Sequence, residues 1–324
     1  MERSLTDPAS LVRRWRLREG SEGDISAASE RFALKVSDHL ARALEGAGES
    51  DPLVRQFLPS TEELVEREGF VSDPVGDTHA QQTPGLLQKY RGRALVVTSA
   101  ACPVHCRYCF RREFPYSEGS ASNHWPEVPS ALRSDPSVTE VILSGGDPLS
   151  LSNAALARAI SSLEEIPSLE RMRIHTRFPT VSPSRVDEGL TKLLATTRFA
   201  PVIVVLHVNH ARELEGESAS AVKRLRATGA TLLSQSVLLR GVNDDEETLA
   251  ALSESLGALG VMPYYLHLLD RVRGAGHFEV PEPRAVELVR ALALRLPGYL
   301  VPRLVREVEG DGAKRPVAVG LRAG

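Results

Sequence analysis

The sequence lacks a long apolar run, an excess of basic residues, internal repeats and low-complexity tracts. No segment approaches the roughly 18 consecutive apolar residues that a membrane span needs, and the first residues alternate charges with single apolar side chains, unlike a secretory leader. A formal net charge of -3 over 324 residues gives no broad basic field for nucleic acid or an anionic membrane. We therefore expect a cytoplasmic protein that binds a small molecule.

Cysteine is also scarce, because the chain has only Cys102, Cys106 and Cys109. An odd, clustered set is not a disulfide framework and indicates a ligand set in a reducing compartment. The spacing C-x3-C-x2-C can wrap three thiolates around an iron–sulfur cube and leave one iron open for a substrate. The alternative is a structural zinc site that adds a histidine such as His105 or His124, which would make the chain a non-catalytic adaptor.

The first 85 residues have helical patterning. Apolar residues recur at near-helical spacing over Asp24–Leu44, and Thr61 begins a segment with a cap followed by acidic residues. The segment Asp77–Gly85 is rich in Gln, Thr and Gly and is typical of a connector. We expect a helical region at 1–85, a central domain at 86–296 and a carboxyl-terminal segment at 297–324, in which Gly310–Pro316 forms a loop.

The central domain alternates short β-rich runs with helical segments such as Asn153–Glu165 and Ala219–Thr228. This alternation predicts an α/β fold with a parallel sheet, and polar residues just past the strand ends are where such sheets carry chemistry. The runs are Ala94–Ser99, Val138–Ser144, Met172–Thr176, Pro201–Val208, Thr231–Leu238 and Val261–His267.

Four motifs together carry a family resemblance. They are the cysteine run Cys102-Pro-Val-His-Cys106-Arg-Tyr-Cys109 with its continuation Cys106-Arg-Tyr-Cys-Phe-Arg-Arg112, Lys89-Tyr-Arg-Gly-Arg93, Gln235-Ser-Val-Leu-Leu-Arg-Gly-Val-Asn-Asp244 and Tyr264-Tyr-Leu-His-Leu-Leu-Asp270. The first resembles the cluster loop of radical S-adenosylmethionine enzymes. Together they resemble lysine 2,3-aminomutase from about Asp51 to Leu321, in the branch that makes (R)-β-lysine for elongation factor P. The resemblance implies a partial (β/α)6 TIM-like barrel of the radical S-adenosylmethionine type, with an amino-terminal helical appendage and a short carboxyl-terminal segment carrying the cofactor lysine.

The resemblance also implies three cofactors: a 4Fe–4S cluster, S-adenosylmethionine and pyridoxal 5′-phosphate. The three cysteines would hold the cluster, whose electron splits S-adenosylmethionine to a deoxyadenosyl radical. The residues expected to bind S-adenosylmethionine are Ser144, Gly145, Gly146, Asp147, His207 and Gln235. A Gly-Gly-Asp segment after a strand is by itself more often only a tight turn.

Lys314 matches the lysine that forms a Schiff base with pyridoxal phosphate, while Lys89, Tyr90 and Arg93 match the residues around its phosphate. The family has arginine at the position of Lys89, so this chain keeps the charge there and loses the bidentate fork. Arg111 matches the arginine that pairs with the substrate α-carboxylate.

Asp270 and Glu307 match the positions that select the ε-ammonium of lysine. Glu307 stands where the enzymes acting on free lysine carry aspartate. Lysine is therefore the expected substrate, although an aminomutase for another amino acid or for secondary metabolism remains an alternative.

The resemblance implies flavodoxin or ferredoxin as the electron donor and an elongation factor P ligase as the user of the product. With no cysteine to spare, the chain is not expected to form the zinc-clamped oligomers of longer relatives. A homodimer through the amino-terminal helices stays open.

Overall fold

The computed structural model describes residues 4–320, except for the side chain of Asn123. At its centre lies a sheet in the order β12-β11-β10-β9-β8-β7-β6-β5-β4-β3. Its strands are β3 (Gln81–Thr83), β4 (Leu86–Tyr90), β5 (Arg93–Val97), β6 (Glu140–Ser144), β7 (Arg171–Thr176), β8 (Ile203–His207), β9 (Thr231–Val237), β10 (Met262–His267), β11 (Arg303–Arg306) and β12 (Arg315–Pro316). Strands β5 to β11 are parallel, and the edge strands β3, β4 and β12 pair antiparallel.

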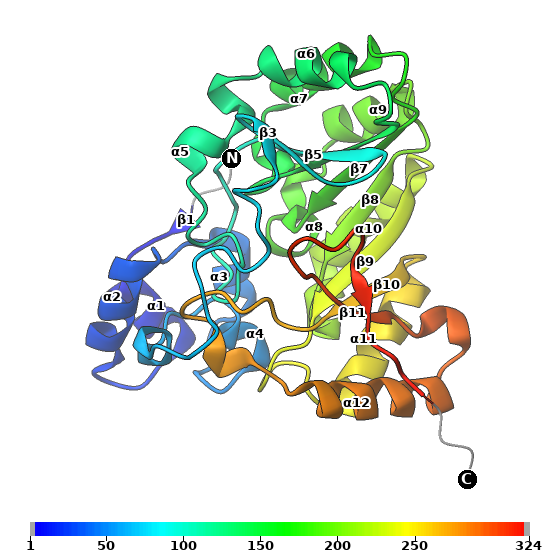
Figure 1. Ribbon diagram of the computed structural model, residues 1–324. Coiled ribbons are helices and arrows are strands. Elements are labelled where there is room, and N and C mark those ends of the chain that lie inside the picture. Colours follow the sequence, from blue (N-terminus) through cyan, green and yellow to red (C-terminus); the bar gives the residue numbers. More distant parts are fainter. Residues whose placement is uncertain (1–3, 321–324) are drawn as a thin grey trace.

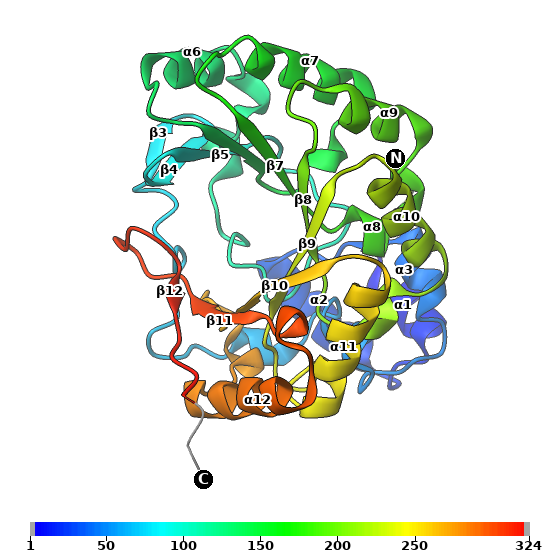
Figure 2. The ribbon, with the colours of Figure 1, turned by 90° about the vertical axis from the view of Figure 1, so that its right-hand side faces the viewer.

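Helices cover the outer face of this curved, open sheet (Figure 2). They are α6 (Glu127–Ser134), α7 (Asn153–Glu164), α9 (Glu188–Thr196), α10 (Gly216–Ala227), α11 (Glu246–Ala258) and α12 (Glu282–Arg295), with the short α5 (Tyr116–Gly119) and α8 (Phe178–Val181) in loops. In α7, Ser152 caps the first turn, and Leu156, Ile160 and Leu163 recur on the buried face. The six predicted strands are β5 to β10, which confirms the partial parallel barrel.

Two elements at the carboxyl end differ from expectation. Strand β11 is a seventh parallel strand beside β10. It has no recognisable apolar run, because only Leu304 and Val305 of its four residues are buried and apolar. The expected loop Gly310–Pro316 ends in β12, which pairs with β11. Main-chain pairing to an existing strand edge therefore makes β12, without any β-rich run of its own.

The amino-terminal helices form a unit beside the barrel (Figure 1). They are α1 (Pro8–Trp15), α2 (Ser21–Arg31), α3 (Asp38–Ala43) and α4 (Pro52–Arg55), joined by the antiparallel pair β1 (Ser4–Leu5) and β2 (Val36–Ser37). Their apolar cluster also includes Val104 and Val181 of the barrel loops. The expected boundary at residue 85 falls between the paired strands β3 and β4. The domain limits stay a prediction, and residues 1–3 and 321–324 lie outside the described part.

The helical pattern over Asp24–Leu44 falls on two helices, α2 and α3, with an extended stretch between them. Helix α2 ends at Arg31, and Phe32 is extended, with φ -142° and ψ 110°. The carbonyls of Phe32 and Ala33 accept hydrogen bonds from the Arg107 guanidinium at 3.0 and 3.3 Å. Contacts with the cysteine loop thus replace the helical hydrogen bonds that the local spacing favours.

Candidate active site

Alternation along the strands separates a core face from a barrel interior. On β6, Val141 and Leu143 belong to the core beneath the helices, whereas Ser144 lies on the other face. By the same alternation the predicted residues Arg93, His207 and Gln235 face the barrel interior. His207 and Gln235 are direct neighbours on β8 and β9. These four residues from four strands therefore line one interior.

The three cysteines lie in the loop that follows β5, and the amino-terminal unit holds this loop by its backbone. His105 N–H donates to the Lys35 carbonyl at 2.9 Å, and Arg107 N–H donates to the Gln56 carbonyl at 2.9 Å. The fully buried Arg107 guanidinium also pairs with Glu63 through two hydrogen bonds of 2.7 Å. The cysteine loop is thus fixed from behind before any ligand binds.

The thiols themselves form a suitable donor set for a cluster. Burial and the neighbouring thiols raise the pKa of Cys102 well above its usual value, and burial with Cys106 raises the pKa of Cys109 to about 11. Iron binds the thiolate form, so a bound cluster would replace the protons that these thiols hold in the structure. Within residues 4–320 no three His, Cys, Asp or Glu side chains converge on a single ion, whereas a cube binds each cysteine at a different iron.

The histidines named for the zinc alternative have other partners. His105 Nδ1 lies 2.7 Å from the Ala33 carbonyl, and its ring stacks on Phe32. His124 Nδ1 lies 3.0 Å from Glu127 Oε1 in an exposed helix start. Each contact occupies one ring nitrogen, and within residues 4–320 no histidine joins two of the cysteines in a group that could hold a metal ion.

The glycine-rich turn after β6 approaches the start of the cysteine loop. Gly145 has φ +117°, and a Cβ on Gly146 would lie 2.5 Å from the Ala101 carbonyl oxygen, so both positions need glycine. Gly146 N–H donates to the Ser99 carbonyl at 2.7 Å, and Asp147 N–H donates to the Ala101 carbonyl at 2.9 Å. The turn and the cysteine loop are therefore built as one surface.

The Asp147 carboxylate is buried and well supplied with donors. It accepts from Leu149 N–H at 3.0 Å, from Arg177 N–H at 2.7 Å and from the Thr176 hydroxyl at 2.9 Å. Burial nevertheless raises its pKa to about 6. Asp147 thus shapes the turn, and a role toward a ligand stays a prediction.

A second set of predicted residues forms a chain of alternating charges. Arg111 Nε donates to Asp77 at 2.6 Å, and the other Asp77 oxygen lies 2.5 Å from Lys89 Nζ. Lys89 also pairs with Glu307 at 3.0 Å, and Glu307 pairs with Lys314. Residues far apart in sequence thus meet, including the predicted cofactor lysine and the predicted carboxylate-binding arginine.

The two predicted selectivity acids differ in protonation. Burial, with the nearby charge of Glu307, raises the pKa of Asp270 to about 7. Burial opposes ionisation of Glu307 as well, but the ammonium groups of Lys314 and Lys89 outweigh it and hold the Glu307 pKa well below its usual range. Glu307 is therefore an ionised carboxylate paired with the ammonium groups of Lys89 and Lys314. Asp270 forms no ion pair with the described residues.

The barrel interior next to this charge chain contains polar atoms without partners. Arg93 Nε, His175 Nε2 and His267 Nε2 are buried and have no hydrogen bond. Burial and Lys314 lower the pKa of His267 to about 3, and burial with Arg173 and Lys314 lowers that of His175, so both imidazoles are neutral. Buried polar atoms are normally satisfied, so this interior fits a polar ligand such as pyridoxal phosphate.

The remaining predicted residues lie beside these groups. The Arg93 guanidinium lies over the Tyr90 ring at 4.7 Å from its centroid, which orients both side chains. Burial and Glu307 raise the pKa of Tyr90, which keeps its hydroxyl protonated. His207 Nε2 lies 2.8 Å from the Tyr108 hydroxyl, so this histidine contacts the cysteine loop directly.

Sequence reasoning missed Asp77, His175 and Arg177. Asp77 lies in the segment expected to be a connector, yet it is buried and bridges two predicted site residues. His175 and Arg177 lie at and just past the end of β7, where the strand-end rule could have flagged them. Nothing in the sequence near Asp77 signals its partners, which come from β4 and the cysteine loop.

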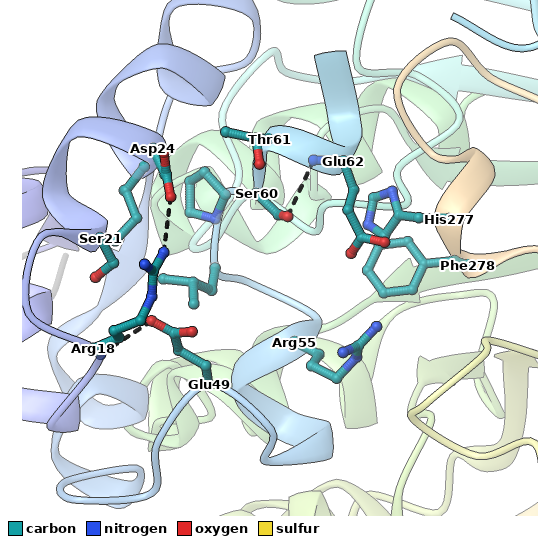
Figure 3. Close-up of a pocket in the computed structure, with 13 residues that line it drawn as sticks. Arg18, Ser21, Asp24, Glu49, Arg55, Ser60, Thr61, Glu62, His277 and Phe278 are labelled. Carbon is teal, nitrogen blue, oxygen red and sulfur yellow. Dashed lines mark hydrogen bonds and ion pairs between the residues drawn. The ribbon is translucent and has the colours of Figure 1, made fainter. Parts of the chain in front are cut away.

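A cavity of about 220 Å³ lies apart from these groups, between the amino-terminal unit and the 3-10 turn η6 (Gly276–Phe278) (Figure 3). Arg55, Glu62 and His277 face it, and none of the predicted site residues line it. Phe278 separates it from the cysteine loop and meets the Tyr108 ring edge-on, with centroids 6.0 Å apart.

Comparison with known proteins defines the class. A model of the 4Fe-4S single cluster domain matches residues 90–174, which include the cysteine loop and the turn after β6. A solved radical SAM methyltransferase from Sphaerobacter thermophilus has 18% identity and a TM-score of 0.49 over 68% of each chain. The cluster-domain match and the three-cysteine loop define an iron–sulfur protein, and the partial parallel barrel is the fold that the radical S-adenosylmethionine resemblance implied.

The family follows from relatives of nearly the same length. L-lysine 2,3-aminomutase of Escherichia coli is 42% identical over 98% of this chain and 93% of its own. That of Haemophilus influenzae is 41% identical over 97% of this chain and 93% of its own. The chain belongs to the L-lysine 2,3-aminomutase family.

This membership confirms an isomerase acting on an amino acid, and it overturns the zinc-adaptor alternative. The expected cofactor set of 4Fe–4S cluster, S-adenosylmethionine and pyridoxal phosphate is likewise confirmed. The residues that hold each cofactor stay a prediction. No helix within residues 4–320 is both long and apolar enough to cross a membrane.

Proposed function

We propose that this enzyme converts L-lysine to (R)-β-lysine and that the reaction depends on pyridoxal phosphate. The observation that carries the proposal is the charge chain, which begins at the Arg111 guanidinium and ends at Glu307 and Lys314, with the buried Asp270 close enough to feel their charges. Arg111 suits an α-carboxylate, while Asp270 and Glu307 suit a terminal ammonium. A diamino acid presents these two charges, whereas a neutral or acidic side chain would leave the buried Asp270 without a paired cation.

The residues divide among the three cofactors. The cluster would be held by Cys102, Cys106 and Cys109; S-adenosylmethionine by Ser144, Gly145, Gly146, Asp147, His207 and Gln235; and pyridoxal phosphate by Lys89, Tyr90, Arg93 and, covalently, Lys314. When bound, these groups supply a carbon radical and an electron sink for the migrating amine. The orphaned interior atoms and the interacting thiols support this division.

Lys314 must change partners when pyridoxal phosphate is loaded. In the structure its Nζ pairs with Glu307. A covalent bond to a carbonyl carbon requires the neutral amine, so Lys314 has to leave Glu307 and lose a proton first. In the loaded enzyme that departure would leave Glu307 Oε2 open toward the ε-ammonium of the substrate, while Oε1 keeps its contact with Lys89.

Anaerobic turnover of the reconstituted enzyme tests the proposal. L-lysine, S-adenosylmethionine, pyridoxal phosphate and dithionite are supplied, and the product is resolved by chiral chromatography and mass spectrometry. We expect (R)-β-lysine, and none when pyridoxal phosphate is removed. Cleavage of S-adenosylmethionine with another amino acid rearranged in preference to lysine would contradict the substrate, and β-lysine formation without pyridoxal phosphate would contradict the dependence.

The similarity to the Escherichia coli and Haemophilus influenzae enzymes supports a cytoplasmic role in which (R)-β-lysine passes to an elongation factor P ligase. Flavodoxin or ferredoxin would supply the electron, and a homodimer through the amino-terminal helices is compatible with this role. Incubation of the enzyme with lysine, a ligase and elongation factor P would then add the mass of one β-lysyl group to elongation factor P. An unchanged mass in the presence of free β-lysine would contradict this destination.

A further inference from the structure

Arg177 is a buried arginine directly behind the cysteine loop. It follows β7, precedes α8 and is 6% exposed. Its Nη1 lies 3.0 Å from Cys106 Sγ and also contacts the Tyr108 hydroxyl. A fixed positive charge therefore lies against a sulfur atom that is proposed to bind iron.

The opposite edge of the guanidinium is held by two side chains from other elements. Nη2 donates to Gln56 Oε1 at 2.7 Å and to Glu213 Oε2 at 2.7 Å. Glu213 is itself fixed, because its Oε1 accepts from Asn209 N–H at 2.9 Å. The guanidinium cannot turn away from Cys106 without leaving a buried carboxylate unpaired, which is costly.

The main chain of Arg177 reaches the other half of the surface. Its N–H donates to Asp147 Oδ2 at 2.7 Å, in the glycine-rich turn proposed to bind S-adenosylmethionine. One residue therefore contacts both the cysteine loop, by its side chain, and this turn, by its backbone.

We propose that Arg177 is a positioning residue that donates a hydrogen bond to the Cys106 sulfur in the loaded enzyme and thereby raises the reduction potential of the cluster. One-electron reduction adds negative charge to the cluster, and a buried cation hydrogen-bonded to a ligand sulfur stabilises the more negative form. The inference rests on the proposed ligation of iron by Cys106.

The test measures the cluster by itself, without turnover. Iron and sulfide per chain and the midpoint potential, from a dithionite titration followed by electron paramagnetic resonance, are compared among variants. Arg177→Lys keeps the charge and shortens the reach. The double variant Arg177→Gln with Glu213→Gln removes the ion pair as a unit and leaves no buried carboxylate uncompensated. Arg198→Gln is the control, because it removes an exposed guanidinium that donates to the Leu169 and Ile166 carbonyls, away from the cysteine loop.

We expect Arg198→Gln to keep the natural potential, Arg177→Lys to shift it to a more negative value, and the double variant to shift it further. If the double variant fails to retain iron, the proposal is judged by the midpoint potential of Arg177→Lys alone. A natural potential in Arg177→Lys, with full iron, would overturn the proposal.

Cys106→Ala separates this inference from the ligation on which it rests. Loss of the natural cluster signal in Cys106→Ala supports ligation by Cys106, and an unchanged potential in the arginine variants then contradicts the inference alone. A natural signal in Cys106→Ala would overturn both.

Discussion

The two regions proposed to bind cofactors are built in opposite ways. The cysteine loop rests on fully buried ion pairs such as Arg107 with Glu63, and its backbone is bonded to the amino-terminal unit. The Lys314 loop has exposed neighbours, and its lysine is about one-fifth exposed and held by Glu307. A cluster needs ligands that are held rigidly by buried contacts. A lysine that bonds to and releases a cofactor needs an ion-pair partner that it can leave.

The largest effect should come from Lys314→Ala. Without its amine the enzyme loses the covalent attachment of pyridoxal phosphate, so β-lysine should fall below detection by mass spectrometry. Because the cysteine loop is supported independently, iron per chain should stay at the natural value. Loss of iron in this variant would contradict the independence of the two regions.

Glu63→Gln tests the rigid support of the cysteine loop. Glu63 is fully buried and pairs with Arg107 and Arg112, so neutralising it leaves two buried cations and should lower the free energy of unfolding by about 3–5 kcal/mol. Iron retention should fall as well. Chemical denaturation and iron analysis check both results. Glu309→Gln, which removes an exposed contact with His79 beside the Lys314 loop, should change neither quantity.

Asp77→Asn tests the charge chain at its hidden member. The variant keeps the side-chain shape but removes the charge that holds Arg111 and Lys89, so Arg111 is no longer fixed for the substrate carboxylate. We expect the KM for lysine to rise about tenfold, the equivalent of one charged hydrogen bond, with iron unchanged. An unaltered KM would show that Arg111 is oriented by other contacts.

The smallest effect is a dependence on pH. With a pKa of about 7, Asp270 should be about a quarter ionised at pH 6.5 and three quarters at pH 7.5, so lysine affinity should rise about threefold between them. Since the folded enzyme keeps this proton above the unfolded pKa, Asp270 also makes stability fall as pH rises from about 4 to 7. Asp270→Asn should flatten both profiles, measured by binding and by thermal unfolding. Profiles that match the natural enzyme would contradict the assignment.

Strands β5 to β10 could be predicted because each carries its own apolar pattern, whereas β11 has only Leu304 and Val305 as buried apolar residues. Gly145 and Gly146 could be predicted for a similar reason, since a turn that needs glycine shows it locally. Asp77 could not, because its role depends on Lys89 and Arg111 reaching it from distant segments. The end of helix α2 at Arg31 could not be predicted for the same reason, because its cause is Arg107 on the cysteine loop.

The covalent role of Lys314 is tested most directly by mapping the lysine that holds pyridoxal phosphate. Borohydride reduction of the loaded enzyme fixes the cofactor to its amine, and peptide mass spectrometry locates the modified residue. We expect a single modification at Lys314 that is absent in Lys314→Ala. Modification of Lys89, which shares Glu307 with it, or of a lysine outside the barrel would contradict it.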